Sequence, residues 1–150
     1  MHSLFEDYFN CLQGLHDDIK KCIDGLPQEA LYWVPGAEMN SLCVIAVHVA
    51  GSQRYWIGDI ISQEDSKRDR DAEFRARGLD AVELTKRLDE SLAYTKGILE
   101  RLRLEDLETI CVSPKDDRKF TKGWVLWHVL EHVANHLGHA QLTRQLWEQR

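Results

Sequence analysis

Residues 121–148 read TKGWVLWHVLEHVANHLGHAQLTRQLWE, and this stretch decides the fold. Its apolar residues recur at intervals of three and four, which is the spacing of one face of an α-helix. Thr121 carries a hydroxyl of the kind that caps the first turn of a helix. The stretch therefore predicts a helix over 122–148, which would be about 40 Å long at a rise of 1.5 Å per residue.

The same apolar spacing predicts three further helices, over roughly 3–25, 42–61 and 80–103. The first is followed by Gly25 and Pro27, the second can be capped by Asn40 or Ser41, and the third begins with the capping-box pair Asp80 and Glu83. Residues 27–39 and 104–120 contain prolines, and residues 62–78 carry a mixed run of charges, which is typical of a solvated loop. We interpret these three segments as irregular connections.

Four amphipathic helices in 150 residues predict an all-α fold, a four-helix bundle that forms a single domain over residues 1–150. The connection at 62–78 is long enough to cross the bundle. We therefore expect the helices over 42–61 and 80–103 to run parallel, which gives an up-down-down-up order.

The composition excludes several classes of function. The chain has 19 Lys and Arg against 25 Asp and Glu, a net charge of −6, so we expect no nucleic-acid partner. Its longest clearly apolar run in the middle, 42–47, is far shorter than the about 20 residues that span a membrane. The N-terminus does not read as a signal peptide, and the four cysteines show no C-x-x-C spacing. We expect a cytoplasmic protein that does not bind membranes.

Four of the seven histidines, at positions 128, 132, 136 and 139, lie in the quoted stretch. At 100° per residue they share an arc of about 80° on one helical face, which we expect to point inward. Buried imidazoles are costly unless they are hydrogen-bonded or bound to a metal. The histidine face therefore predicts a metal site. His2 and His16 lie apart from it, His16 at what we interpret as a polar edge beside Asp17.

A single helix cannot surround a metal ion, so further ligands must come from a facing helix. His48 is the candidate, because it lies on an apolar helix and is followed by the small residues Ala50, Gly51 and Ser52. Spacing alone leaves three histidine pairs open on the last helix: 128 with 132, 132 with 136, and 136 with 139.

Two motifs together resemble the DinB superfamily of bacterial metal-binding bundles. They are His48 within Ile45-Ala46-Val47-His48-Val49-Ala50-Gly51, and the C-terminal His132, His136, Gly138 and His139 in the pattern His-x-x-x-His-x-Gly-His. The resemblance covers essentially the whole chain. It implies a four-helix bundle, often a homodimer, with a metal held by His48, His132 and His136. That superfamily includes mycothiol-dependent maleylpyruvate isomerase and thiol S-transferases, in which the metal is expected to bind a thiol cofactor as thiolate.

The chain departs from both branches of that superfamily. Many members have Gln where this chain has His139, and the mycothiol-dependent branch has Glu where this chain has His132. The resemblance therefore names no particular thiol or substrate. His128 is additional, and we interpret it as lining the site.

Three imidazoles leave open positions on a divalent ion, which is the pattern of catalytic rather than structural zinc. We expect zinc or nickel, with iron or manganese as alternatives, and a low-molecular-weight thiol as a candidate cofactor. The ion would activate a thiol or a water against a small-molecule substrate. Candidates for orienting ligands or moving protons are His128, Glu131, Asn135 and His139.

Two other functions stay open. The protein could be a non-catalytic, metal-stabilised and stress-associated dimer, which a fourth protein ligand from His128 or His139 would favour. It could also be a small-ligand-binding bundle without metal, in which Trp33, Trp56, Trp124 and Trp127 line a pocket.

Overall fold

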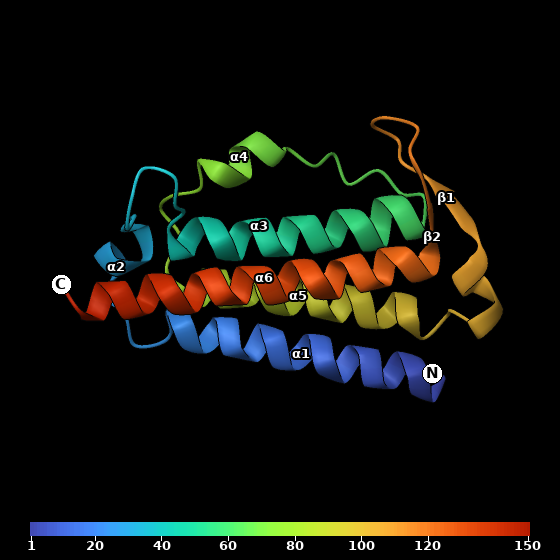
Figure 1. The fold of residues 1–150 in the computed structure, drawn as a ribbon, viewed down its shortest axis with the longest axis horizontal. Coiled ribbons are helices and arrows are strands. Elements are labelled where there is room, and N and C mark those ends of the chain that lie inside the picture. Colours follow the sequence, from blue (N-terminus) through green and yellow to red (C-terminus); the bar gives the residue numbers. More distant parts are fainter.

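The computed structural model describes all residues from Met1 to Arg150. Four long helices lie side by side: α1 (Ser3–Ile23), α3 (Leu42–Arg54), α5 (Ala81–Leu99) and α6 (Lys122–Glu148) (Figure 1). α1 and α6 run in one direction and α3 and α5 in the other. This confirms the all-α four-helix bundle and its up-down-down-up order.

The helix starts follow from local chemistry. Ser41 Oγ accepts a hydrogen bond from the backbone N–H of Val44 at 3.2 Å, and Thr121 Oγ1 accepts one from Trp124 at 3.1 Å. At the start of α5, Asp80 and Glu83 form the predicted capping box. These side chains satisfy N–H groups that have no partner within the helix, so they fix where α3, α5 and α6 begin.

The second predicted helix, over 42–61, is not α-helical throughout. It continues past Arg54 as a π-helical segment over Tyr55–Ile61, in which Tyr55 is buried. A π-helical turn widens the helix and changes the direction in which the following side chains point. This segment leads into the end of the bundle that holds the two strands.

The connections contain more structure than the sequence predicts. Residues 27–39 include the short helix α2 (Gln28–Tyr32), and residues 104–120 include a 3-10 turn (Leu104–Glu108). Two short strands, β1 (Ile110–Val112) and β2 (Lys119–Thr121), form an antiparallel hairpin with Cys111 opposite Phe120. The prediction of an irregular segment at 104–120 is therefore wrong. The hairpin carries its turn, residues 113–118, over one end of the bundle (Figure 1).

The prediction of a solvated loop at 62–78 is only partly correct, since most of the segment is exposed or half-buried and without regular structure. This segment contains helix α4 (Arg70–Phe74), packs against α3 and buries Glu73, which is 6% exposed. A mixed run of charges can be buried when the charges pair with each other, and Arg68 and Glu73 do so. The long crossover is thus a layer on the outer face of α3.

The core between the four helices is mostly apolar, and it contains a buried polar network. His16, which we placed at a polar edge, is 0% exposed, and its Nε2 lies 2.7 Å from Oε1 of Gln53. The amide nitrogen of Gln53 donates to Ser91 O and Thr95 Oγ1. The network links α1, α3 and α5 inside the bundle. None of the helices combines the length and apolar character needed to cross a membrane.

Candidate metal centre

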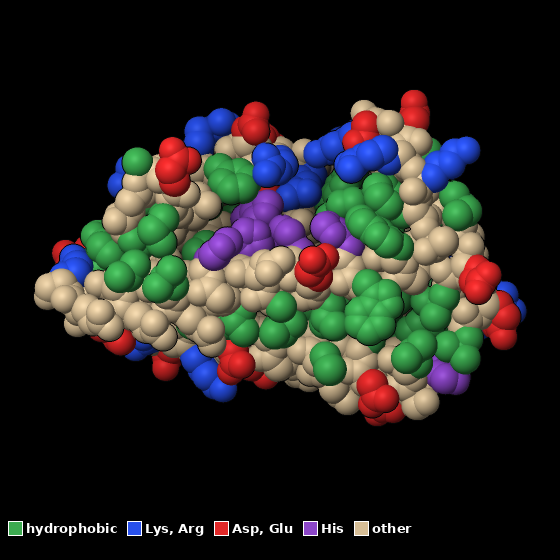
Figure 2. Space-filling model, in the orientation of Figure 1, with side chains coloured by type: hydrophobic (Ala, Val, Ile, Leu, Met, Phe, Trp, Pro, Cys, Tyr) green, Lys and Arg blue, Asp and Glu red, His purple; other side chains and the backbone are tan.

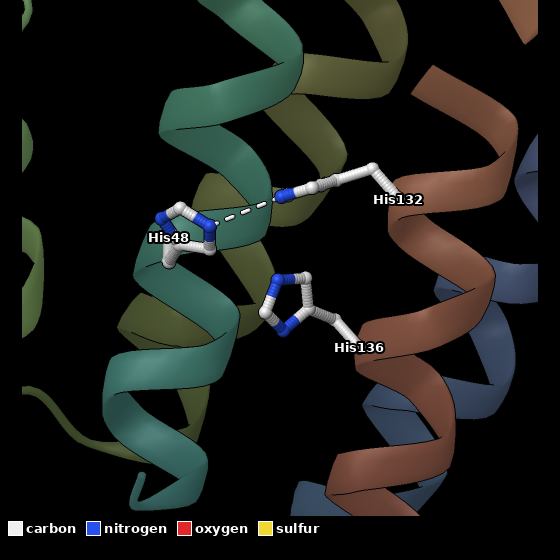
Figure 3. Close-up of side chains that lie close together, drawn as sticks. All are labelled: His48, His132 and His136. Atoms are coloured by element: carbon white, nitrogen blue, oxygen red, sulfur yellow. Dashed lines mark hydrogen bonds between the residues drawn. The ribbon is translucent and has the colours of Figure 1, made fainter. Parts of the chain in front are cut away.

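His48 lies in the middle of α3 with its ring in the groove between α3 and α6. The residue is only 5% exposed, because α3 is covered by α5, α6 and the crossover. Nε2 of His48 lies 3.1 Å from Nε2 of His132 on α6 (Figure 3). The two helices thus bring together imidazoles from opposite halves of the sequence.

His132 and His136 stand one turn apart on α6 and both face His48 (Figure 3). Their ring centroids are 5.0 Å and 4.8 Å from that of His48, and 4.5 Å from each other. One nitrogen from each of the three rings lies within 4.8 Å of the other two. Two nitrogens bound to one ion at about 2.1 Å are at most about 4.2 Å apart, so a small rotation of the rings is enough to enclose an ion.

The electrostatics of the site keep two of these rings neutral. Burial, together with the neighbouring imidazoles, lowers the pKa of His132 to about 3. The same two causes lower the pKa of His136 to about 4. At neutral pH both rings therefore offer lone pairs, the form in which imidazole binds a metal.

The outer nitrogen of His48 is held by Glu73. Nδ1 of His48 lies 2.8 Å from Oε2 of Glu73, and Arg68 contacts both oxygens of that carboxylate, Nε at 2.6 Å from Oε1 and Nη2 at 2.8 Å from Oε2. Burial raises the pKa of Glu73, but the hydrogen bonds from Arg68 and His48 outweigh it, so the pKa lies below its usual value. An ionised carboxylate accepts from Nδ1–H and leaves the lone pair of Nε2 facing the other two rings.

The sequence missed both Glu73 and Arg68. Their only signal was the spacing Arg68-x-x-x-x-Glu73 within a run of mixed charges, and that run also fits a solvated loop. Gly51 contributes as well: a methyl group at this position would overlap the Glu73 carboxylate. The small residues after His48 therefore leave room for a side chain from the crossover, where we expected a neighbouring helix or a substrate.

The other candidates from α6 do not join the triad. The ring of His128 is 6.0 Å from that of His132, and the ring of His139, which is exposed, is 5.5 Å from that of His136. Glu131 and Asn135 are exposed on α6 and make no contact with the triad rings that would add them to the group. The prediction that the histidine face points inward is thus only partly correct, because its C-terminal residue, His139, is exposed to solvent. No fourth histidine closes the group.

His128 instead belongs to an aromatic wall. Its ring stacks on Trp124 with centroids 4.9 Å apart and meets Trp56 edge to face at 4.5 Å. Trp124 in turn stacks on Phe120 from β2. Burial lowers the pKa of His128. Of the four tryptophans that the alternative of a ligand-binding bundle would place in a pocket, Trp56 and Trp124 stand beside the site. Trp33 pairs with Trp147, and Trp127 is 71% exposed elsewhere.

A cavity of about 250 Å³ opens next to His48 and His132. The aromatic wall bounds one side of it, and the hairpin turn and the crossover bound the others. The lining residues are His48, Ser52, Tyr55, Trp56, Arg68, Arg70, Lys115, Asp116, Arg118, His128 and His132. The triad therefore has space beside it for a small molecule.

The fold and the site together define a class of protein. Its members are small four-helix bundles in which the second and third long helices run parallel, and a histidine triad lies between the second and fourth long helices. The chain belongs to the mycothiol-S-transferase family, whose model matches residues 7–149. The resemblance to the DinB superfamily is thereby confirmed.

Solved structures show the same fold. A conserved protein from Enterococcus faecalis superposes with a TM-score of 0.82 at 16% identity, covering 97% of each chain. YfiT from Bacillus subtilis, described as a probable metal-dependent hydrolase with an unusual four-helix bundle topology, superposes with a TM-score of 0.78 at 13% identity, covering 97% of this chain and 88% of its own. Comparison with curated proteins gave no match.

Proposed function

We propose that this protein is a metal-dependent enzyme of the thiol S-transferase type, with a divalent ion held by His48, His132 and His136. The observation that carries the proposal is the convergence of three imidazole nitrogens within 4.8 Å beside a cavity. Three nitrogen ligands with an open side are typical of catalytic metal sites, whereas structural sites have four protein ligands.

The donor set supports a borderline ion such as zinc or nickel over a hard ion such as magnesium, because all three atoms are imidazole nitrogens. Iron and manganese remain alternatives. When bound, the ion would act as a Lewis acid that brings the pKa of a thiol or a water toward neutrality.

The protein's own residues have separate tasks in this proposal. Glu73 orients the ring of His48 and supplies a negative charge that strengthens Nε2 of that ring as a metal ligand. Trp56 and His128 shield one side of the cavity from water. The cavity positions a small-molecule substrate beside the triad, which is where an activated nucleophile would act.

Family membership supports thiol transfer as the first candidate reaction. A second candidate is hydrolysis, which the description of YfiT as a probable metal-dependent hydrolase favours. The two reactions use the same ion and differ in whether a thiol or a water occupies the open side.

The alternative of a non-catalytic, metal-stabilised dimer predicts a closed ligand set. Neither His128 nor His139 lies within the triad, which supports the enzyme over this alternative. A homodimer in the cytoplasm remains our prediction for the state in which the enzyme works.

The test has two steps. Purified protein is loaded with zinc or nickel and its metal content is measured, where we expect one ion per chain and loss of that ion in His132→Ala. The loaded protein is then given low-molecular-weight thiols and a panel of electrophiles, with hydrolysable esters and amides as a second panel. Turnover by the wild type and not by a folded His132→Ala variant is expected, and equal rates for both would overturn the proposal.

A further inference from the structure

The cavity beside the triad has the opposite charge to the rest of the protein. The chain carries a net charge of −6, yet four cationic side chains and only one carboxylate line this cavity. The cations are Arg68 and Arg70 from the crossover and Lys115 and Arg118 from the hairpin turn. Figure 2 shows a group of Lys and Arg side chains directly beside the histidines.

Two of these cations have carboxylate partners within the protein. Arg68 is bound by Glu73, and Nε of Arg118 lies 2.7 Å from Oδ2 of Asp116. The other two, Arg70 and Lys115, form no ion pair. Arg70 lies over the ring of Phe74 at 4.8 Å and Lys115 over the ring of Tyr55 at 4.9 Å. Their positive charges are therefore available to a ligand.

The two free cations come from different elements that the fold brings to one cavity. Arg70 begins α4, and Lys115 lies in the turn between β1 and β2. The hairpin turn is held to the bundle by the hydroxyl of Tyr55, which lies 3.3 Å from Oγ of Ser113. The two cations thus reach the cavity from two elements that lie far apart in the sequence.

We propose that the ligand of this site is a small molecule with two carboxylate groups, which Arg70 and Lys115 bind while its reacting atom faces the histidine triad. This inference rests on the proposed function for the identity of the reacting end. Its anionic end follows from the cavity alone: two unpaired cations above a cluster of imidazoles attract an anion, and a divalent ion would strengthen that attraction.

The carboxylates could belong either to the thiol or to the molecule that the thiol attacks. Both sources share the same recognition chemistry, in which the planar guanidinium of Arg70 forms paired hydrogen bonds and the ammonium of Lys115 supplies a point charge. A neutral thiol or a neutral electrophile would leave both cations without a partner.

The experiment measures binding by calorimetry with three probes: mercaptosuccinate, which is a dicarboxylate thiol; 1-thioglycerol, which is a neutral thiol; and succinate, which has no thiol. With zinc-loaded wild type we expect mercaptosuccinate to bind at least tenfold more tightly than 1-thioglycerol. Arg70→Gln and Lys115→Gln should each weaken mercaptosuccinate binding about five- to tenfold and leave 1-thioglycerol unchanged. Lys119→Gln removes an exposed charge from the same hairpin outside the cavity and should change neither.

Two results would overturn the inference. One is equal affinity of the wild type for mercaptosuccinate and 1-thioglycerol, and the other is an equal effect of Lys115→Gln and Lys119→Gln. Metal content and circular dichroism are measured for each variant, so that loss of the ion or of the fold is not mistaken for loss of the anion site.

Succinate separates this inference from the proposed function. We expect succinate to bind the metal-free wild type and to bind Lys115→Gln about five- to tenfold more weakly. If the protein takes up no metal but succinate binds in this way, the proposed function fails and the anion site stands. If metal and 1-thioglycerol bind, but Arg70→Gln and Lys115→Gln bind succinate and mercaptosuccinate as tightly as the wild type does, only the anion site fails.

The same probes address the source of the carboxylates. Tighter binding of mercaptosuccinate than of succinate, seen only with zinc present, would assign the carboxylates to the thiol. Equal affinities of the two probes would assign them to the electrophile.

Discussion

Nδ1 of His48 donates its hydrogen to Oε2 of Glu73 across 2.8 Å, although 25 positions separate the two residues in the sequence. The carboxylate selects the ring tautomer in which Nε2 carries the lone pair. Because Arg68 donates two hydrogen bonds to the same carboxylate, the orientation of His48 depends on two residues of the crossover. The crossover is therefore part of the candidate metal centre.

Replacing Glu73 with Gln should weaken metal binding by about 10- to 100-fold. The amide oxygen can still accept from Nδ1–H, but the negative charge that strengthens His48 as a metal ligand is lost, and Arg68 is left without its ion pair. The measurement is a competition with a chromogenic chelator at pH 7.

The matched control is Glu64→Gln. Glu64 also pairs with an arginine of the bundle, Arg54, at 2.7 Å, but it lies outside the centre and is 40% exposed. We expect this variant to bind metal as the wild type does. Equal metal affinity in Glu73→Gln and the wild type would show that Glu73 has no part in the site.

Gly51→Ala should have the same effect as loss of Glu73 by a different route. The added methyl group overlaps the buried carboxylate, which must leave Nδ1 of His48 to make room. We expect weaker metal binding in the competition assay, and no further loss when Gly51→Ala is combined with Glu73→Ala, since the truncated side chain already lacks the interaction with His48 that the methyl group disrupts.

Gly97→Ala in α5 is the control for this substitution. A Cβ at Gly97 meets nothing within 4 Å, so alanine there should stabilise the helix by about 0.5–1 kcal/mol in urea unfolding and leave metal affinity unchanged. Full metal affinity in Gly51→Ala would mean that Glu73 has another position from which it can hold His48.

The sequence was sufficient to predict the four long helices, because their apolar residues repeat with the period of an α-helix. The caps at Ser41, Asp80 and Thr121 and the crossover length together determine the bundle and its helix directions. The convergence of His48 with His132 and His136 was predicted from the resemblance. Spacing alone left several histidine pairs open, because an i, i+4 relation recurs along α6.

What the sequence could not predict depends on contacts between segments far apart in the chain. Whether Glu73 is buried or solvated depends on its contact with His48, 25 positions away, and the local spacing of Arg68 and Glu73 also fits a solvated loop. His16 was misplaced for the same reason, since its neighbours in sequence are acidic while its partner is Gln53 on another helix. The hairpin was missed because strands of three residues are too short to show an alternating pattern.

Removal of the metal should destabilise the protein by a predictable amount. An ion at 100 times its dissociation constant contributes about 2.7 kcal/mol, which corresponds to a fall in Tm of about 5–10 °C for a chain of this size when a chelator is added. His132→Ala should show no response to the chelator. A Tm that the chelator lowers equally in the wild type and in His132→Ala would place the stabilising ion elsewhere.

His16 should make the stability of the protein depend on pH. Burial lowers its pKa to about 4, against the hydrogen bond with Gln53, which raises it. The unfolded state, with an ordinary pKa of about 6.5, therefore binds more protons below neutrality, and the stability that is present at pH 7 is lost as the pH falls toward 4. This one group should cost about 2 kcal/mol of the free energy of unfolding between pH 7 and pH 5.

This contribution is measured by urea unfolding at pH 7 and pH 5, with a chelator present to empty the metal centre. The loss in free energy of unfolding between the two pH values is compared for the wild type and a variant that lacks His16. The comparison variant is His16→Leu with Gln53→Leu, which replaces the pair by apolar side chains of similar size, while Ser91 and Thr95 keep hydrogen bonds to their own helix. His132 and His136 titrate in both proteins, so their contribution cancels in the difference. The wild type should lose about 2 kcal/mol more than the variant, and equal losses would mean that His16 is hydrated or charged in the folded protein.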